Sequence, residues 1–326
     1  MKNRLHNGFT LVELMIAMVL GVLLAGGVLS LFVSGVQSFR LDENVARMQD
    51  EARFAISELS RDLRMAGYLA EPLIPAAITP VGGLAAGVDC GNGQANWILS
   101  LTDAVTGETN TLTSVDNATG AAANAAYSCV NAGEIVANTD VVGIKRLAGD
   151  AVPVAQLQAN TIYVRSNGSQ GLFYQAPLGI PFPLPLNDWE YRPQIYYIRN
   201  FTNVGGDGIP SLCRKVMTFG APTGMTTECI AQGIEDLQVE YGLDTDGSGS
   251  ANRYLPNPTL TELQQVVSAR VFILARTLDA DQGYKDNRTY SLSNANAYKP
   301  NDAFHRRLYT VTVPINNIRN RVKLGI

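Results

Sequence analysis

One carboxylate, Glu13, lies close to the start of a long apolar run. The run begins GFTLVELMIAMVLGVLLAGG at residue 8, and no residue from Leu14 to Val36 is charged. A charge inside such a membrane-length segment costs a few kcal/mol on insertion, so its presence indicates a function. The chemistry open to Glu13 is ion pairing, and a free α-amino group, its own or that of a neighbouring copy, is the natural partner.

The residues before the run allow three interpretations of it. Lys2 and Arg4 are basic and no acid accompanies them, which predicts a cytoplasmic N-terminus. A secretory signal peptide has a shorter apolar core, of about 7–15 residues, and a plain signal anchor explains the length but not Glu13. Cleavage after Gly8 starts the mature chain at Phe9. It then places Glu13 in the first turns of a helix, where the helix dipole favours a carboxylate.

Four cysteines lie in the part of the chain predicted to be exported. In an oxidising compartment an even set is expected to form two disulfides, and four cysteines allow three pairings that the sequence leaves open. The pairing expected here is Cys90 with Cys129 and Cys213 with Cys229, because both close loops of moderate length. A metal site is disfavoured because there is no C-x-x-C pair and the mature chain retains one histidine, His305.

The stretch DTDGSGS resembles the opening of a calcium-binding loop. Asp244, Asp246 and Ser248 have the spacing of the first three ligands, and Gly249 stands where the sharp turn needs glycine. The twelfth position is Leu255 rather than a bidentate glutamate, so a complete EF-hand is not predicted. Ca²⁺ is therefore the one candidate cofactor, and a polar turn between two strands is the alternative.

No pattern of catalytic residues stands out. The chain has no G-x-x-x-x-G-K-[ST] loop, no H-E-x-x-H and no G-x-S-x-G. A single mature histidine also argues against Ser-His-Asp or Cys-His chemistry. We assign no catalytic residue and predict that the protein is not an enzyme.

A second helical pattern follows the apolar run over residues 37–67. Apolar side chains recur every three or four residues and form one stripe of an amphipathic helix. The stripe consists of Leu41, Val45, Met48, Ala52, Ala55, Leu59, Leu63 and Ala66. Gly67 and Pro72 supply the stop. The sequence therefore predicts one long helix whose first half suits a membrane and whose second half packs on a globular domain.

Residues 68–326 are predicted to form a β-rich domain with long loops. Strand-forming segments bounded by turn residues are 96–101, 140–146, 161–165, 194–201, 233–243, 268–277 and 306–314. Segments 78–88 and 117–127 are rich in alanine and glycine and are interpreted as surface loops. The proline-rich segment 176–189 is interpreted as an edge or wrapping loop. The expected fold class is α+β, with the helix stripe packed on an antiparallel sheet.

The charge of this domain limits its partners. Residues 68–326 carry 18 basic and 22 acidic side chains. Nonspecific nucleic-acid binding needs clustered lysine and arginine, so no nucleic-acid partner is expected.

Two segments carry a family resemblance. GFTLVELMIAMVLG resembles the class III signal of type IV pilins and type II secretion pseudopilins. The resemblance implies that a prepilin peptidase cuts between Gly8 and Phe9 and N-methylates Phe9. It also implies that Glu13 neutralises the N-terminal amine of an adjacent subunit in the filament. The segment MQDEARFAISELSRDLRMAGY, residues 48–68, resembles PilW-type minor pilins in particular.

The resemblance implies a domain plan and a location. Residues 1–8 are the leader, 9–36 the membrane and assembly half of the helix, 37–67 its amphipathic half, and 68–326 the periplasmic or extracellular domain. Before assembly the chain is expected to be an inner-membrane protein with one span and a cytoplasmic N-terminus. After assembly it is expected in the pilus at the cell surface.

The same resemblance implies the partners and leaves two alternatives. The expected partners are inner-membrane lipid, other minor pilins and the major pilin in a tip complex that primes the filament, and a large tip adhesin. One alternative is a J-type minor pseudopilin of type II secretion. That alternative predicts that loss of the protein abolishes secretion and leaves twitching motility normal. The other is an adhesive or receptor module at the pilus tip.

Overall fold

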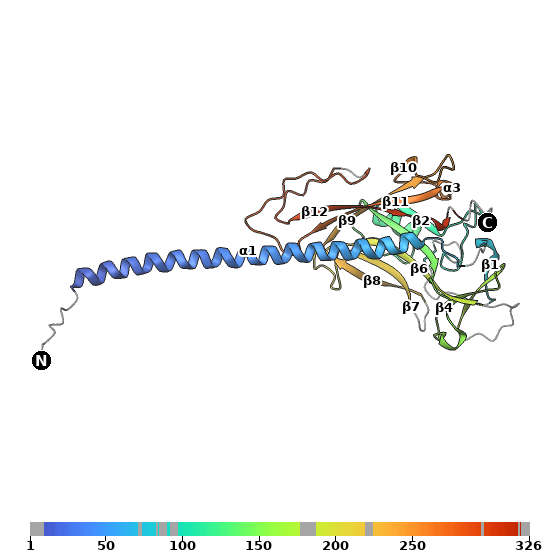
Figure 1. Ribbon diagram of the computed structural model, residues 1–326, viewed down its shortest axis with the longest axis horizontal. Helices are drawn as coiled ribbons and strands as arrows, with labels where there is room; N and C mark the ends of the chain where they lie inside the picture. The colour runs from blue at the N-terminus through green and yellow to red at the C-terminus, as the bar shows by residue number, and fades with distance from the viewer. Residues whose placement is uncertain are drawn as a thin grey trace. The chain divides into compact units, whose positions relative to one another are not determined.

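The computed structural model describes residues 10–70, 74–82, 84, 90–91, 97–176, 187–218, 224–294, 297–318 and 320. The chain divides into two units, Met1–Arg47 and Met48–Ile326. The long helix α1 (Leu11–Met65) precedes a domain of strands, and this confirms the α+β class (Figure 1). The strands are β1 (Ile78–Pro80), β2 (Leu112–Ala118), β3 (Thr139–Leu147), β4 (Ile162–Ser166), β5 (Gly171–Gln175), β6 (Asn187–Arg199), β7 (Ser211–Thr218), β8 (Gly224–Gln232), β9 (Ile234–Leu243), β10 (Arg253–Leu255), β11 (Val266–Arg276) and β12 (Arg306–Pro314). The short α-helices are α2 (Gly120–Ala126) and α3 (Leu260–Leu263), and three short 3₁₀ turns cover Pro75–Ala77, Ala132–Glu134 and Val154–Gln156.

Helix α1 has the apolar stripe that its sequence predicts. From Met48 onward every residue of the predicted stripe is buried. The helix ends at Met65, and Gly67, two residues later, has a φ of 70°, the left-handed conformation that commonly follows a helix end. Asn317 Nδ2 donates to the carbonyl of Arg64 at 2.9 Å and so satisfies one of the last carbonyl groups of the helix.

The first sheet is centred on β6 and β3. Its strand order is β1-β5-β4-β6-β3-β2, β7 pairs with the second half of β6, and β8 pairs with β7. All pairs are antiparallel except β1 with β5. Every residue of β3 is buried, and its polar residues, such as Lys145 and Arg146, have hydrogen-bond partners inside the domain.

The two faces of the first sheet are covered by different parts of the chain. Tyr191, Ile195 and Tyr197 of β6 belong to a core cluster with Ile98 and Tyr127, which come from the segment between β1 and β3. The second half of α1 covers the opposite face, as the contacts described below show. The sheet is therefore the middle layer of the domain.

The second sheet has the strand order β10-β9-β11-β12 and is antiparallel throughout. The chain passes into it from β8 through one residue, Gly233, which has a φ of 70°. A Cβ atom at this position would lie 2.6 Å from the carbonyl oxygen of Arg276. Only glycine therefore suits this corner, at which one continuous segment of chain leaves the first sheet and enters the second.

Four of the sequence interpretations are wrong in whole or in part. Segment 96–101 is not a strand: Trp97–Leu99 form a turn whose apolar side chains fill the core beside β6. Segment 117–127 is not a loop throughout, because it contains the end of β2 and helix α2. Thr119 caps α2 by accepting a hydrogen bond from the Ala122 backbone at 3.2 Å. Segment 78–88 likewise begins with β1. Most of the proline-rich segment lies outside the described residues, but its last three residues, 187–189, are the start of β6 rather than a loop.

Candidate functional site

The start of α1 is held by a reciprocal pair of side chains, Thr10 and Glu13. The backbone N–H and the hydroxyl of Thr10 both donate to Glu13 Oε2, at 2.9 and 2.8 Å. The Glu13 backbone N–H donates to Thr10 Oγ1 at 3.3 Å. This is a capping box, in which a threonine and the glutamate three residues later satisfy backbone donors at a helix start. The sequence-predicted processing residues Gly8 and Phe9 lie just outside the described residues.

The capping box fixes the Glu13 carboxylate but uses only one of its oxygens. Oε1 accepts no hydrogen bond from the described residues, and the side chain is exposed. A carboxylate has lone pairs for about four hydrogen bonds. The helix start therefore presents a positioned negative charge that can accept further donors from an amine.

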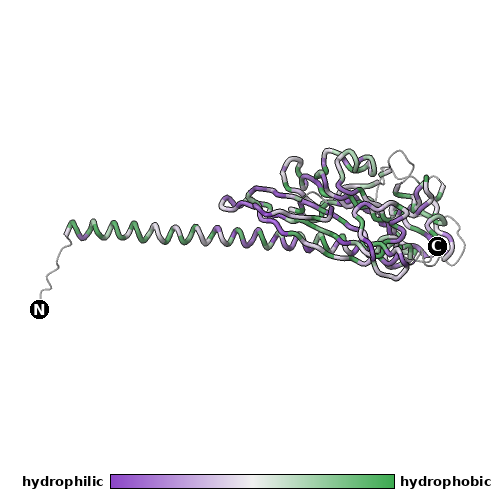
Figure 2. Tube along the Cα trace, turned by 90° about the horizontal axis from the view of Figure 1, so that it is seen from above, coloured by the Kyte–Doolittle hydropathy of each residue, from purple (hydrophilic) through white to green (hydrophobic). Residues whose placement is uncertain are grey.

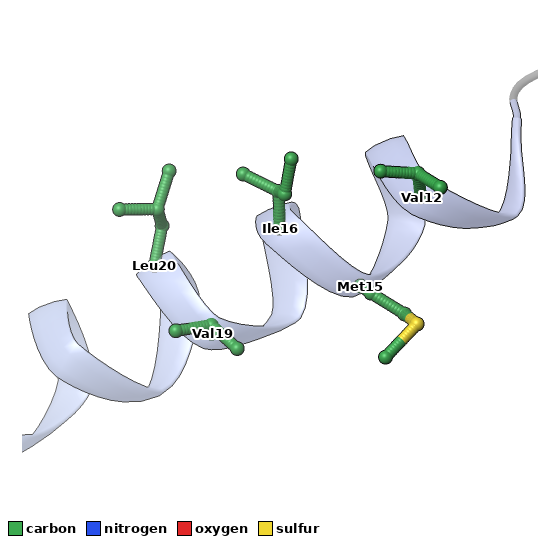
Figure 3. A pocket seen from close by; sticks show the side chains of 5 residues that line it. All are labelled: Val12, Met15, Ile16, Val19 and Leu20. Atoms are coloured by element: carbon green, nitrogen blue, oxygen red, sulfur yellow. The ribbon is translucent and has the colours of Figure 1, made fainter.

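The turns after Glu13 carry exposed apolar side chains. Val12, Ile16 and Leu20 follow one another along the helix with Met15 and Val19 beside them, and all five are at least half exposed (Figure 3). The hydrophobic colour continues along this half of the helix (Figure 2). One 18-residue window of α1 has a mean hydropathy of 2.6, and none of that window is buried. By length and composition, this segment can cross a membrane or pack among other apolar helices.

Three acidic side chains attach the second half of α1 to the first sheet. Glu51, Glu58 and Asp62 are spaced by seven and four residues and lie on one face of the helix. Glu51 accepts the backbone N–H of Gln232, the last residue of β8, at 2.9 Å. Glu58 accepts Arg214 of β7 at 3.1 Å. The helix thus crosses the sheet from β8 toward its centre.

Asp62 is the most deeply buried of the three. Arg146 of β3 donates to it from Nε and Nη2, at 3.0 and 2.6 Å, and Tyr196 of β6 donates from its hydroxyl. The Asp62 side chain is fully buried and that of Arg146 is 5 % exposed. Burial and the nearby Asp62 charge raise the pKa of Tyr196, so its hydroxyl remains a donor. Sequence reasoning missed this site, because Asp62 lies beside the apolar stripe and reads as a surface acid.

The cysteines form the two disulfides that the sequence favours. Cys90 is bonded to Cys129, across 39 residues, and Cys213 to Cys229, across 16. The second disulfide joins β7 to β8 at paired positions of the sheet. It lies one residue from Arg214 and therefore supports the strands on which α1 rests.

In the predicted calcium loop, residues 244–250, the backbone donates hydrogen bonds to the aspartate carboxylates of the loop itself. Asp244 Oδ2 accepts the Gly249 backbone N–H at 2.8 Å, and Asp246 Oδ1 accepts that of Ser248 at 3.0 Å. These bonds are typical of polar turns. Within the described part of the chain, no group of three or more His, Cys, Asp and Glu side chains could hold a metal ion. Calcium binding at Asp244, Asp246 and Ser248 stays a prediction.

Comparison with known families matches two parts of the chain. Residues 195–317, from β6 to just beyond β12, match the family described as Type IV Pilus-assembly protein W. Residues 3–29 match the Prokaryotic N-terminal methylation motif. Neither description is that of an enzyme. No curated protein and no solved structure matches the chain. The chain is therefore similar to the methylation-motif family at its start and to a type IV pilus-assembly family over the larger part of its second half.

Proposed function

We propose that this protein is a structural subunit that helps to initiate type IV pilus assembly, within a complex of minor pilins that primes the filament. The observation that carries the proposal is the placement of Glu13. It is the one charged residue between Arg4 and Arg40, and the capping box holds it at the exposed start of an apolar helix.

The proposed mechanism uses the new N-terminus that processing creates. A prepilin peptidase cuts after Gly8 and methylates Phe9, and the chain stays in the inner membrane with its domain in the periplasm. Apolar helices of neighbouring subunits then bundle. The free oxygen of Glu13 accepts the N-terminal amine of a neighbour, which pairs two charges in a low-dielectric setting and fixes the stagger of the helices.

The match to a pilus-assembly family favours this role over a secretion pseudopilus. The first test is the intact mass and N-terminal fragment spectrum of the protein extracted from its own membranes. The expected chain begins at N-methylated Phe9. A chain that begins after the apolar run, or one that retains residues 1–8, would contradict the mechanism.

Substitution of Glu13 tests the assembly step separately. Glu13→Gln keeps the side-chain shape but removes the charge, so a neighbouring amine is left unpaired. We expect normal processing and a decrease of at least about tenfold in the sheared pilus fraction at native expression. Glu43→Gln removes an exposed acid of the same helix outside the apolar run and serves as the matched control. Normal incorporation of the Glu13 variant excludes the role.

A further inference from the structure

One face of the second half of α1 is exposed and mostly polar. Within the second unit, α1 exposes Asp50, Arg53, Phe54, Ser57, Arg61 and Arg64. All but Arg53 follow one another at intervals of three or four residues, so they line one face of the helix, and Arg53 adjoins Phe54. We call these six residues the outer stripe.

Phe54 is the large apolar side chain of the outer stripe and is 50 % exposed. The apolar residues of the inner face, such as Met48 and Leu59, are at most 5 % exposed. A single exposed phenylalanine is ordinary in a folded protein. Phe54 differs from an ordinary exposed phenylalanine because charged side chains of the outer stripe surround it.

Two arginines of the outer stripe lack carboxylate partners among the described residues. Arg53 and Arg64 form no ion pair with any residue of the described ranges, whereas Arg61 contacts Glu58 at 2.6 Å. Of the acids on the domain-facing side of the helix, Glu51 and Asp62 are bound by β8 and β3, and Glu58 is shared between Arg214 of β7 and Arg61. Asp50 is the one acid of the stripe, so its net charge is positive, whereas residues 68–326 are net acidic.

We propose that the outer stripe is a docking surface for a carboxylate-bearing face of another pilin subunit. Phe54 enters an apolar pocket of the partner, and Arg53 and Arg64 pair with its acids. Aromatic and arginine side chains are the residues that most often carry interface energy, and the arginine fork matches carboxylate geometry. This proposal rests on the proposed function, which supplies the class of partner.

Charge argues against a second copy of this chain as the partner at the same face. Two outer stripes brought together would face three arginines and one aspartate with the same set, so like charges would oppose each other. The outer stripe therefore requires a different surface as its partner, one with excess acid at the contact, and the proposed complex of minor pilins supplies other subunits that can present it.

The test places a photoreactive residue at the centre of the stripe. The full chain, with p-benzoylphenylalanine at position 54, is expressed at native level in its own cells and irradiated. Val204 is 69 % exposed in the loop after β6, and the same substitution there is the matched control. We expect position 54 to cross-link to a protein that itself carries a methylation motif, through an acidic peptide identified by mass spectrometry. Position 204 should give no such product.

Charge reversal tests the two arginines. Arg53→Glu with Arg64→Glu should lower the yield of that cross-link at least fivefold, and lysine at both positions should retain most of it. Arg253→Glu, at a side chain that is 58 % exposed in β10, is the control and should leave the yield unchanged. An unchanged yield in the double glutamate variant overturns the proposal, as do cross-links from position 54 only to lipid or to a second copy.

The sheared pilus fraction separates failure of this proposal from failure of the proposed function. If the chain is present in that fraction but position 54 gives no pilin cross-link, the docking surface is wrong and the assembly role stands. If the chain is absent from the pilus and from complexes with other pilins, the assembly role fails and the docking surface fails with it.

Discussion

Asp62 shows how a residue that looks ordinary in the sequence can hold an element in place. It occupies the helix position just before Leu63 of the apolar stripe, and acids at such positions usually face water. In the structure it is fully buried and is bonded to side chains from two strands. A buried carboxylate of this kind is tolerated because Arg146 compensates its charge and Tyr196 adds a hydrogen bond.

Replacing Asp62 tests this contact. Asp62→Asn leaves the Arg146 guanidinium buried without a negative partner, so we expect the free energy of unfolding to fall by about 3–5 kcal/mol. Urea denaturation of the detergent-solubilised chain measures the change. Arg61→Ala is the control, because that side chain is 55 % exposed and its pair with Glu58 should contribute less than about 1 kcal/mol. A loss below that of the control would show that Asp62 does not anchor the helix.

Asp140 makes a second buried contact, between the two sheets. Its carboxylate accepts the backbone N–H groups of Asn117 and Val239, at 2.8 and 2.7 Å, and so joins the end of β2 to β9. Burial raises the pKa of Asp140 to about 8. The two hydrogen bonds lower this pKa, and the charges of Asp116 and Asp236 raise it.

The raised pKa predicts a dependence of stability on pH. Between about pH 4 and pH 8 the folded protein holds a proton on Asp140 that the unfolded chain has lost, so the free energy of unfolding falls as the pH rises through this range. Denaturation curves at pH 5 and pH 8 measure the difference. Asp140→Asn cannot ionise and should flatten this part of the dependence. If the free energy of unfolding changes equally with pH in the variant, groups other than Asp140 cause the pH dependence.

The sequence predicted the place of Glu13 in the first turns of the helix but not its capping partner, Thr10. Glu13 is identified by being a single acid in an apolar run. Thr10 is identified only by its spacing from Glu13, the Thr-x-x-Glu pattern of a capping box. That signal was present and could have been used. For Asp62 no local signal exists, because its role depends on Arg146, 84 residues away.

At the scale of the elements, the long helix and half of the strands follow from local patterns. The helix has an unbroken apolar stripe and no proline. Strands β3, β4, β9, β11 and β12 coincide with predicted segments, and the second half of β6 coincides with another. Two of the failures have identifiable causes. Segment 96–101 is apolar because it fills the core as a turn, and alanine-rich α2 depends on a cap at Thr119 that composition does not reveal.

The corner between β8 and β9 gives a prediction at this scale. Gly233→Ala forces a side chain into a backbone of positive φ and into contact with the Arg276 carbonyl, so we expect a loss of about 1–3 kcal/mol and a lower melting temperature. Gly205→Ala is the matched control, since a Cβ there meets nothing within 4 Å. Thermal unfolding followed by circular dichroism compares the two. Equal melting temperatures would show that the corner accommodates a side chain.

At the scale of the whole molecule, the arrangement of the strands could not be predicted from the sequence. The strand order places β6 beside β3, β4 and β7, and these pairings depend on long-range contacts rather than on local pattern. The single residue between β8 and β9 resembles a bend within one strand, and only the three-dimensional pairing shows that the chain changes sheets there.

The disulfides should differ in what they contribute to the stability of the molecule. Cys213–Cys229 closes 16 residues within a hairpin that is already paired, whereas Cys90–Cys129 closes 39 residues and joins two cysteines that lie outside the strands. The chain-entropy estimate is about 3 and about 4 kcal/mol respectively. We expect the double serine variant of the longer pair to unfold at lower denaturant concentration. Coincident unfolding curves would contradict this order.

The attachment of α1 to several strands also determines how the domain carries mechanical load. A pull along the axis of the helix loads its contacts with β8, β7 and β3 in shear, so the ion pairs and hydrogen bonds resist together rather than one after another. The first strand to receive the force is β8, through Glu51 and Gln232. The Cys213–Cys229 bond prevents β8 from peeling away from β7, so tension spreads into the middle of the first sheet instead of opening its edge.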